Sequence, residues 1–189
     1  MNLADVQALA RQGEGIDLEF KKSTGELDAA ARSLCGMLNA GVAATVLFGV
    51  TPAGQVRGQQ VSEKTLEEIA SAFAKFQPAV SPSVERIRLP SGTDVLVVSV
   101  AAPKSSVGPF LFDGRAFLRK LNTTRAAEYD ELYSRFRDQV WNERSWDSLP
   151  AEGVTLSDLD DDEIGAAVAD GQRSARIPTG SSTSKADVV

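Results

Sequence analysis

The sequence has no histidine, a single cysteine and no long apolar run, and each absence excludes a class of function. Without histidine there is no Ser-His-Asp or Cys-His catalytic arrangement and no histidine-ligated zinc or iron. With Cys35 as the only cysteine there is no internal disulfide and no cysteine-rich zinc site, which is typical of a reducing compartment. Any catalysis must therefore use carboxylates, lysine, hydroxyls or an added metal.

The chain also lacks the hydrophobic segments that direct a protein to a membrane. No apolar run approaches the ~20 residues that a membrane-spanning helix needs. The N-terminus, Met-Asn-Leu-Ala-Asp-Val, has neither the basic start nor the apolar centre of a signal peptide. The 189 residues, 42% hydrophobic and 24% charged, have the composition of a soluble globular protein. We therefore expect a cytoplasmic protein with no membrane partner.

The net charge of −6 is unevenly distributed along the chain. Residues 151–170 carry seven acidic and no basic residues, and residues 171–189 carry three basic and one acidic residue. Residues 1–150 hold the other 18 acidic and 17 basic residues and are nearly neutral. Because a strongly basic footprint is absent, any nucleic-acid binding has to come from a local patch.

The apolar periodicity predicts an α/β (α+β) domain with a mixed β-sheet and two to three packed helices. Helical spacing indicates helices over 2–12, 24–38, 62–77 and 126–144, and runs of β-forming residues indicate strands over 16–21, 45–50, 84–89, 94–100 and 116–118. The helix over 62–77 has an inner stripe of Leu66, Ile69, Ala70 and Phe73. Cys35 takes a core position in the second helix. We predict that residues 1–145 form this domain, 146–172 an acidic helical connector with a helix at 158–169, and 173–189 a disordered tail.

Charge is concentrated in the stretch from Glu14 to Lys22. The apolar positions of its strand are Ile16, Leu18 and Phe20. The alternation predicts that these face the core while Asp17, Glu19 and Lys21 lie on the opposite face. Two carboxylates beside a lysine could hold a divalent cation, or the charged face could simply be solvated, as in most half-buried strands.

A second concentration of polar residues is the only dense basic and hydroxyl cluster in the chain. It comprises Arg115, Arg119, Lys120, Thr123, Thr124 and Arg125. In one interpretation these side chains contact nucleic-acid phosphates, and in the other they form a solvated cluster that protects an edge strand from pairing. The adjacency of hydroxyls and bases favours phosphate contact.

Two further features have both a functional and a structural interpretation. Trp141 and Trp146 could stack on exposed bases, although aromatic residues at a helix end are more typical of packing. The acidic segment 158–163 could contact a partner, but acidic residues are also common at a helix N-terminus. For both features we favour the structural interpretation.

Several short motifs, in order and at characteristic spacing, resemble the Schlafen-type AlbA-like domain, also described as a DNA-binding, divergent ATPase-associated domain. The motifs are Glu14-x4-Glu19-Phe20-Lys21, Leu38-Asn39, Gly49-Val50-Thr51 and Phe117-Leu118-Arg119. The resemblance covers about residues 10–140. The sequence departs from the family pattern at Leu121, where a glycine is usual, and at residues 42–44, which replace a Gly-Gly pair.

The resemblance implies two functions, of which we favour the first. One is binding of DNA or RNA in a regulatory role, such as transcription regulation in a prokaryote. The other is Mg²⁺- or Mn²⁺-dependent cleavage of RNA or DNA, in which Glu14 and Glu19 would be catalytic residues and metal ligands and Lys21 would assist. The third acid of that nuclease site falls on Thr51, and Asp17 is the nearest substitute. A protein-interaction module is a third alternative, and the resemblance implies a possible homodimer.

Overall fold

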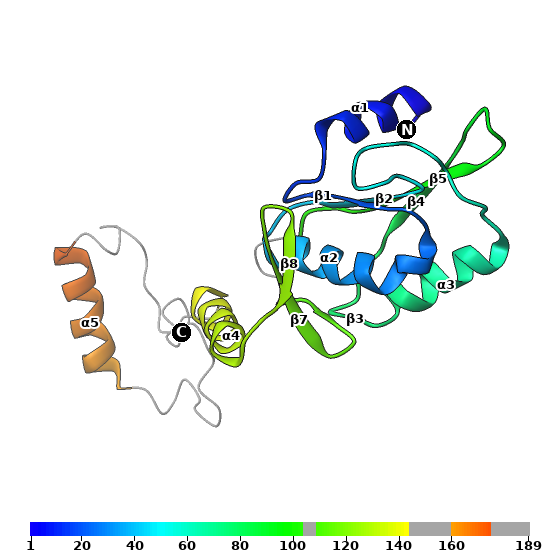
Figure 1. The fold of residues 1–189 in the computed structure, drawn as a ribbon. Helices are drawn as coiled ribbons and strands as arrows, with labels where there is room; N and C mark the ends of the chain where they lie inside the picture. The colour runs from blue at the N-terminus through cyan, green and yellow to red at the C-terminus, as the bar shows by residue number, and fades with distance from the viewer. Residues whose placement is uncertain (104–108, 144–159, 175–189) are drawn as a thin grey trace. The chain divides into compact units, whose positions relative to one another are not determined.

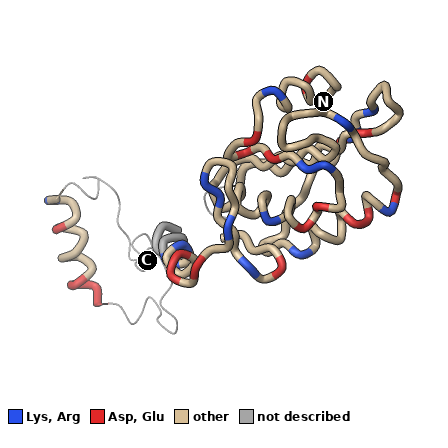
Figure 2. The backbone as a smooth tube through the Cα atoms, in the orientation of Figure 1, with Lys and Arg blue, Asp and Glu red and all other residues tan. Residues whose placement is uncertain are grey.

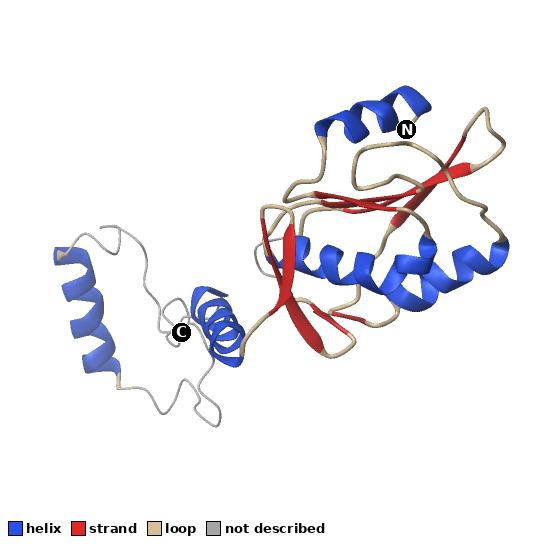
Figure 3. Cartoon of the chain, viewed as in Figure 1, coloured by secondary structure: helices blue, strands red, loops and turns tan. Residues whose placement is uncertain are grey.

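The computed structural model describes residues 1–103, 109–143 and 160–174. It divides the chain into two compact units, residues 1–143 and 144–189. The first unit contains two four-stranded sheets with helices packed against them (Figures 1 and 3). This architecture confirms the predicted mixed α/β fold class, although the strands form two sheets and not one.

The first sheet is mixed and has the strand order β1-β2-β5-β4. Its strands are β1 (Leu18–Lys21), β2 (Ala44–Phe48), β5 (Asp94–Val100) and β4 (Ser83–Arg88). β1 and β2 are parallel, whereas the other neighbouring pairs are antiparallel. Parallel strands need a long crossover, and here it consists of the short helix η1 (Thr24–Glu26) and α2 (Leu27–Asn39).

Both faces of this sheet are covered, which explains the continuous apolar runs of β2 and β5. Val46 and Phe48 of β2 face one core with α2, and Leu47 faces a second core with Val6 and Ala10. The last two residues belong to α1 (Leu3–Gln12), whose first turn is capped by the Asn2 side chain. A strand that is buried on both faces has apolar residues at successive positions.

The second sheet is antiparallel, and α2 packs between it and the first sheet. Its strands, in the order β3-β6-β7-β8, are β3 (Phe76–Gln77), β6 (Leu111–Phe112), β7 (Arg115–Lys120) and β8 (Thr123–Ala126). Phe112 and Phe117 from this sheet share one core with α2 and with β2 and β5. Cys35 lies in this core, as predicted, and burial raises the pKa of its thiol to about 11.

Three more helices complete the described chain. They are α3 (Glu63–Phe73), α4 (Tyr129–Glu143) and, in the second unit, α5 (Asp161–Arg173). Asp160 caps α5 by accepting hydrogen bonds from the Asp162 and Glu163 amides. None of the helices within the described ranges combines the length and hydropathy that a bilayer crossing requires.

Some sequence predictions fall on residues that the structure does not describe. They concern Trp146, the 145/146 domain boundary and residues 175–189 of the predicted tail. The side chain of Trp141 also lies outside the described part. The packing predicted for the two tryptophans and the disorder predicted for the tail therefore stay predictions.

Two details of the predicted core are wrong. Ile16 is 43% exposed, because the Gly15 amide donates to the Leu18 carbonyl (3.0 Å) and this turn places Ile16 before the strand. Leu66 of α3 is also exposed, and Thr65 is buried in its place. Thr65 forms a capping box with Ser62 at the start of α3. The buried apolar residues of this helix are Ile69, Ala72 and Phe73.

Candidate nucleic-acid interface

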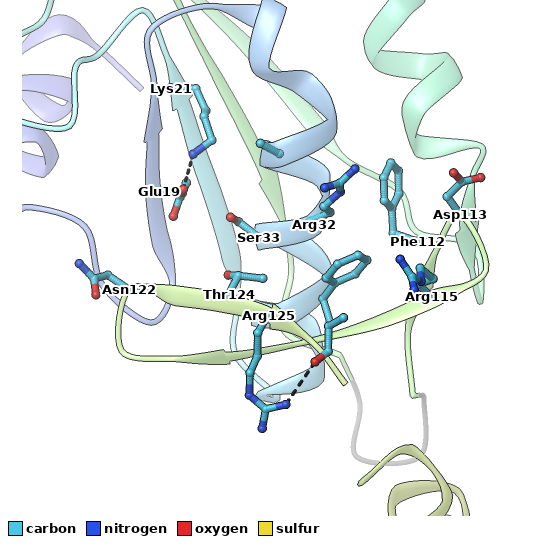
Figure 4. Close-up of a pocket in the computed structure, with 13 residues that line it drawn as sticks. Glu19, Lys21, Arg32, Ser33, Phe112, Asp113, Arg115, Asn122, Thr124 and Arg125 are labelled. Carbon is cyan, nitrogen blue, oxygen red and sulfur yellow. Dashed lines mark hydrogen bonds and ion pairs between the residues drawn. The ribbon is translucent and has the colours of Figure 1, made fainter. Parts of the chain in front are cut away.

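A groove with a volume of about 600 Å³ lies where β1 and α2 meet the second sheet (Figure 4). Its charged lining residues are Lys21, Arg32, Arg115, Arg125, Glu19 and Asp113. Its neutral polar lining residues are Ser33, Asn122 and Thr124. Four cationic and two anionic side chains give the groove a formal excess of two positive charges.

Glu19 lies at the inner side of this groove within a cluster of opposite charges. Its side chain is 9% exposed, with Arg119 Nη2 2.8 Å from Oε2, and Lys21 Nζ forms an ion pair with Oε1. Oε2 accepts no hydrogen bond from the described residues, so its attraction to Arg119 is electrostatic and not a well-directed hydrogen bond. The interpretation of Glu19 as part of a solvated strand face is therefore wrong.

Arg119 is an internal connection between the two sheets. Its guanidinium is fully buried and donates hydrogen bonds to the Gly15 carbonyl (Nε, 2.9 Å) and the Leu18 carbonyl (Nη2, 3.1 Å). It also donates to Thr124 Oγ1 (3.0 Å). Gly36 of α2 permits this position, because a Cβ there would lie 3.1 Å from Arg119 Cβ.

The residues that the resemblance assigns to a metal-dependent nuclease come together only in part, because Glu19 and Lys21 form an ion pair in the groove whereas Glu14 does not line it. Glu14 Oε1 accepts the Phe20 amide (2.9 Å), so this carboxylate stabilises the β1 backbone. Thr51 lies in a hairpin turn, where its hydroxyl accepts the Gln55 amide (3.1 Å). Glu14, Asp17 and Thr51 do not line the groove, and Glu19 is neutralised by two cations.

Within the ranges that the structure describes, no three acidic or cysteine side chains form a group that could hold a metal ion. The donor set at Glu14 and Glu19 therefore does not fit a divalent cation in this conformation. A cation needs several anionic oxygens that are free to bind it.

The structure separates the predicted basic and hydroxyl cluster into three parts. Arg115, Thr124 and Arg125 line the groove (Figure 4). Lys120 and Thr123 are exposed at the β7–β8 turn and do not line it. Arg119 is buried beneath the cluster. Figure 2 shows basic positions along both strands of the hairpin formed by β7 and β8, which we call the basic hairpin.

Several polar residues that line the groove were not among the predicted site residues, namely Arg32, Ser33, Asp113 and Asn122. Arg32 and Ser33 come from α2, and Asn122 comes from the β7–β8 turn. The signal for Arg32 was its position as a lone basic residue between the apolar residues of the second predicted helix. Its guanidinium lies 5.9 Å from the centre of the Phe117 ring, in a cation–π arrangement.

The β7–β8 turn contains one conformation that glycine usually adopts. Leu121 has φ of 56° and is 73% exposed. The family pattern has glycine at this position, and here it is replaced by leucine. A bulky side chain in the left-handed conformation therefore lies in the turn of the basic hairpin.

Arg125 is held at the outer side of the groove by an ion pair with α4. Its Nη1 and Nη2 atoms lie 2.8 and 2.5 Å from the two carboxylate oxygens of Glu131. Glu131 also accepts the Glu128 amide (3.0 Å) in the first turn of α4. The hydrogen bond from Arg125, supported by that amide, lowers the pKa of Glu131 to about 2.

We expect the Glu131 carboxylate to titrate with a midpoint near pH 2, and with a clearly higher midpoint in Arg125→Ala, where the Glu128 amide still lowers the pKa but the arginine no longer does. Because the pKa is lowered on folding, the pair contributes its stabilisation above pH 4.5 and loses it as the pH falls towards 2. Side-chain carboxyl NMR shifts followed between pH 1.5 and 6 measure this midpoint. An identical midpoint in the wild type and in Arg125→Ala would contradict the pairing.

Comparisons with known proteins assign the first unit to a family. The family described as "Schlafen, AlbA_2" matches residues 14–128. No curated protein matches the chain. Among solved structures, the DIP2311 protein from Corynebacterium diphtheriae is 17% identical, with a TM-score of 0.46 over 86% of this chain and 35% of that protein.

The chain thus spans about a third of the length of that solved structure. The family match covers more than half of the 189 residues and includes β1, α2 and both strands of the basic hairpin. It confirms the resemblance that the motifs indicated. The chain belongs to the Schlafen AlbA_2 family.

Proposed function

We propose that the groove binds the sugar-phosphate backbone of nucleic acid. The observation that carries this proposal is the convergence of Lys21, Arg32, Arg115 and Arg125, from four separate elements, on one groove. The first 150 residues are otherwise nearly neutral, so this local excess of positive charge is not a consequence of composition. The family likewise points to a nucleic-acid-related role.

The lining residues differ in how readily they can accept a phosphate. Among the described residues, neither Arg115 nor Arg32 has an ion-pair partner, and the Arg32 guanidinium lies over the Phe117 ring. We therefore assign the first phosphate contacts to these two arginines. Ser33, Asn122 and Thr124 add neutral donors along the groove.

Lys21 and Arg125 would bind phosphate only by exchanging an existing partner. Lys21 is paired with Glu19, and Arg125 is paired with Glu131. The Arg125 pair is exposed to solvent, so a phosphate can reach the guanidinium and replace Glu131 as its partner. Arg119 has a positioning role in this proposal, in place of the direct contact predicted from the sequence.

No contact within the described residues favours the nuclease alternative, because the carboxylates of Glu14 and Glu19 already have other partners. Its Mg²⁺ or Mn²⁺ requirement stays a prediction, and cleavage assays with Mn²⁺ and with EDTA test it. Metal-dependent cleavage that is lost in folded Glu19→Gln would establish the nuclease. A cytoplasmic location, a regulatory role and a homodimer also stay predictions.

The proposal is tested by measuring DNA and RNA binding of Arg115→Ala by fluorescence anisotropy at several salt concentrations. We expect about a 5- to 10-fold weaker affinity and a salt slope that is smaller by about 1, because one phosphate contact is lost.

Arg11→Ala is the matched control, since Arg11 is an exposed arginine of α1 outside the groove. Its affinity should equal that of the wild type. The proposal would be contradicted if both variants bound nucleic acid equally more weakly than the wild type, or if the wild-type protein bound none.

A further inference from the structure

An exposed aromatic stripe follows α4 beyond the groove. It consists of Tyr129, Tyr133 and Phe136, which are 80%, 57% and 45% exposed. Their spacing of four and three residues places them on one helix face. The Tyr129 and Tyr133 rings are stacked, with centroids 6.3 Å apart and an interplanar angle of 13°.

The opposite side of α4 is the side that contacts the domain. Arg135 Nη1 donates to the Asn39 carbonyl at the end of α2 (2.8 Å). Glu131, one turn before Arg135 on the same side of the helix, pairs with Arg125 of β8. An amphipathic helix normally turns its aromatic residues to the core, so an outward aromatic stripe calls for another ligand.

The stripe begins close to the groove along the chain. Arg125 and Ala126 line the groove, and Tyr129 lies three residues further along the chain, a reach of at most about 10 Å. The Arg125–Glu131 pair connects the groove lining directly to the first turn of α4. A strand of nucleic acid whose phosphates lie in the groove therefore reaches the tyrosines within a few nucleotides.

Among its described lining residues, the groove offers no open aromatic ring for base stacking. Its two aromatic residues, Phe112 and Phe117, are 2% and 8% exposed and belong to the core. The groups suited to the nucleic-acid backbone and those suited to bases therefore lie on different surfaces. The charged side chains line the groove, and the exposed aromatic rings lie on α4.

We propose, building on the proposed function, that the aromatic stripe stacks the bases of single-stranded nucleic acid held by the groove. Stacking on an aromatic side chain requires an unpaired base with a free face, and duplexes keep their bases stacked inside. The neighbouring arginines complement a polyanion, which favours this ligand over an apolar protein surface. The protein therefore selects single strands over duplexes of the same sequence.

The test compares binding of single-stranded RNA, single-stranded DNA and duplex DNA of one sequence to the full chain. The variant is Tyr129→Ala combined with Tyr133→Ala, and it should bind both single strands at least 10-fold more weakly while duplex binding stays unchanged. Tyr129→Phe combined with Tyr133→Phe keeps the rings and should bind single strands within about 2-fold of the wild type. Leu66→Ala, which truncates an exposed apolar residue of α3, should have no effect.

Crosslinking of 5-iodouridine oligonucleotides to Tyr129 or Tyr133, mapped by mass spectrometry, would support the proposal directly. Single-strand binding that is unchanged in the alanine variant, while Arg115→Ala binds more weakly, would overturn stacking and leave the groove in place. A change of oligomeric state in the alanine variant without a change in binding would overturn it in favour of a protein interface. If the wild type binds none of the three probes, the groove proposal fails as well.

Discussion

Replacing Asn39 with alanine is expected to lower the free energy of unfolding by about 3 kcal/mol, because the Phe110 amide and the Phe117 carbonyl lose their side-chain partner and the Phe110 carbonyl keeps only the weak donor of the Cys35 thiol. The Asn39 side chain donates to the carbonyls of Phe110 (2.8 Å) and Phe117 (2.9 Å) and accepts the Phe110 amide (2.7 Å). All of these groups are buried. Urea denaturation should show a lower midpoint with an unchanged slope.

The large size of this effect follows from where the hydrogen bonds lie. They join the last turn of α2 to the segment that leads into the second sheet and to β7, which carries the basic hairpin. Asn122→Ala is the matched control, because Asn122 is exposed and should change the stability by less than about 0.5 kcal/mol. A loss below about 1 kcal/mol for Asn39→Ala would show that this side chain does not join α2 to the second sheet.

The first sheet could be predicted from the sequence because its signals are local. β2 and β5 are strands of five and seven residues in which most side chains are apolar, and α2 has a regular helical stripe. The second sheet could not be recognised, because β3 and β6 are only two residues long and show no periodicity. Their place is determined by contacts distant in sequence, such as those of Asn39.

The candidate site was predicted incompletely for the same physical reason. Alternation along β1 correctly separated Leu18 and Phe20 from the charged positions, but it gave no information about what covers Glu19. That cover comes from Arg119, which lies 100 positions further along the chain. Arg32 was missed because a polar residue on a helix becomes part of a groove only when another sheet lies opposite to it.

The burial of Arg119 leads to the second large prediction, which concerns stability and not affinity. Arg119→Ala should lower the free energy of unfolding by about 3–5 kcal/mol, because it leaves the carboxylate of Glu19 and two carbonyls without their buried partner. Arg119→Lys should lose almost as much, since one ammonium group cannot reproduce the planar set of donors. Urea denaturation of both variants measures these losses.

Lys120→Ala is the control for Arg119, because Lys120 is the next residue, carries the same charge and is exposed. Its free energy of unfolding should stay within about 0.5 kcal/mol of the wild type. If Arg119→Ala were as stable as Lys120→Ala and bound nucleic acid with a salt slope smaller by about 1, Arg119 would contact phosphate in solution. A weaker affinity accompanied by a large loss of stability would instead reflect displacement of β1 and the β7–β8 hairpin, since Arg119 connects these elements beneath the groove.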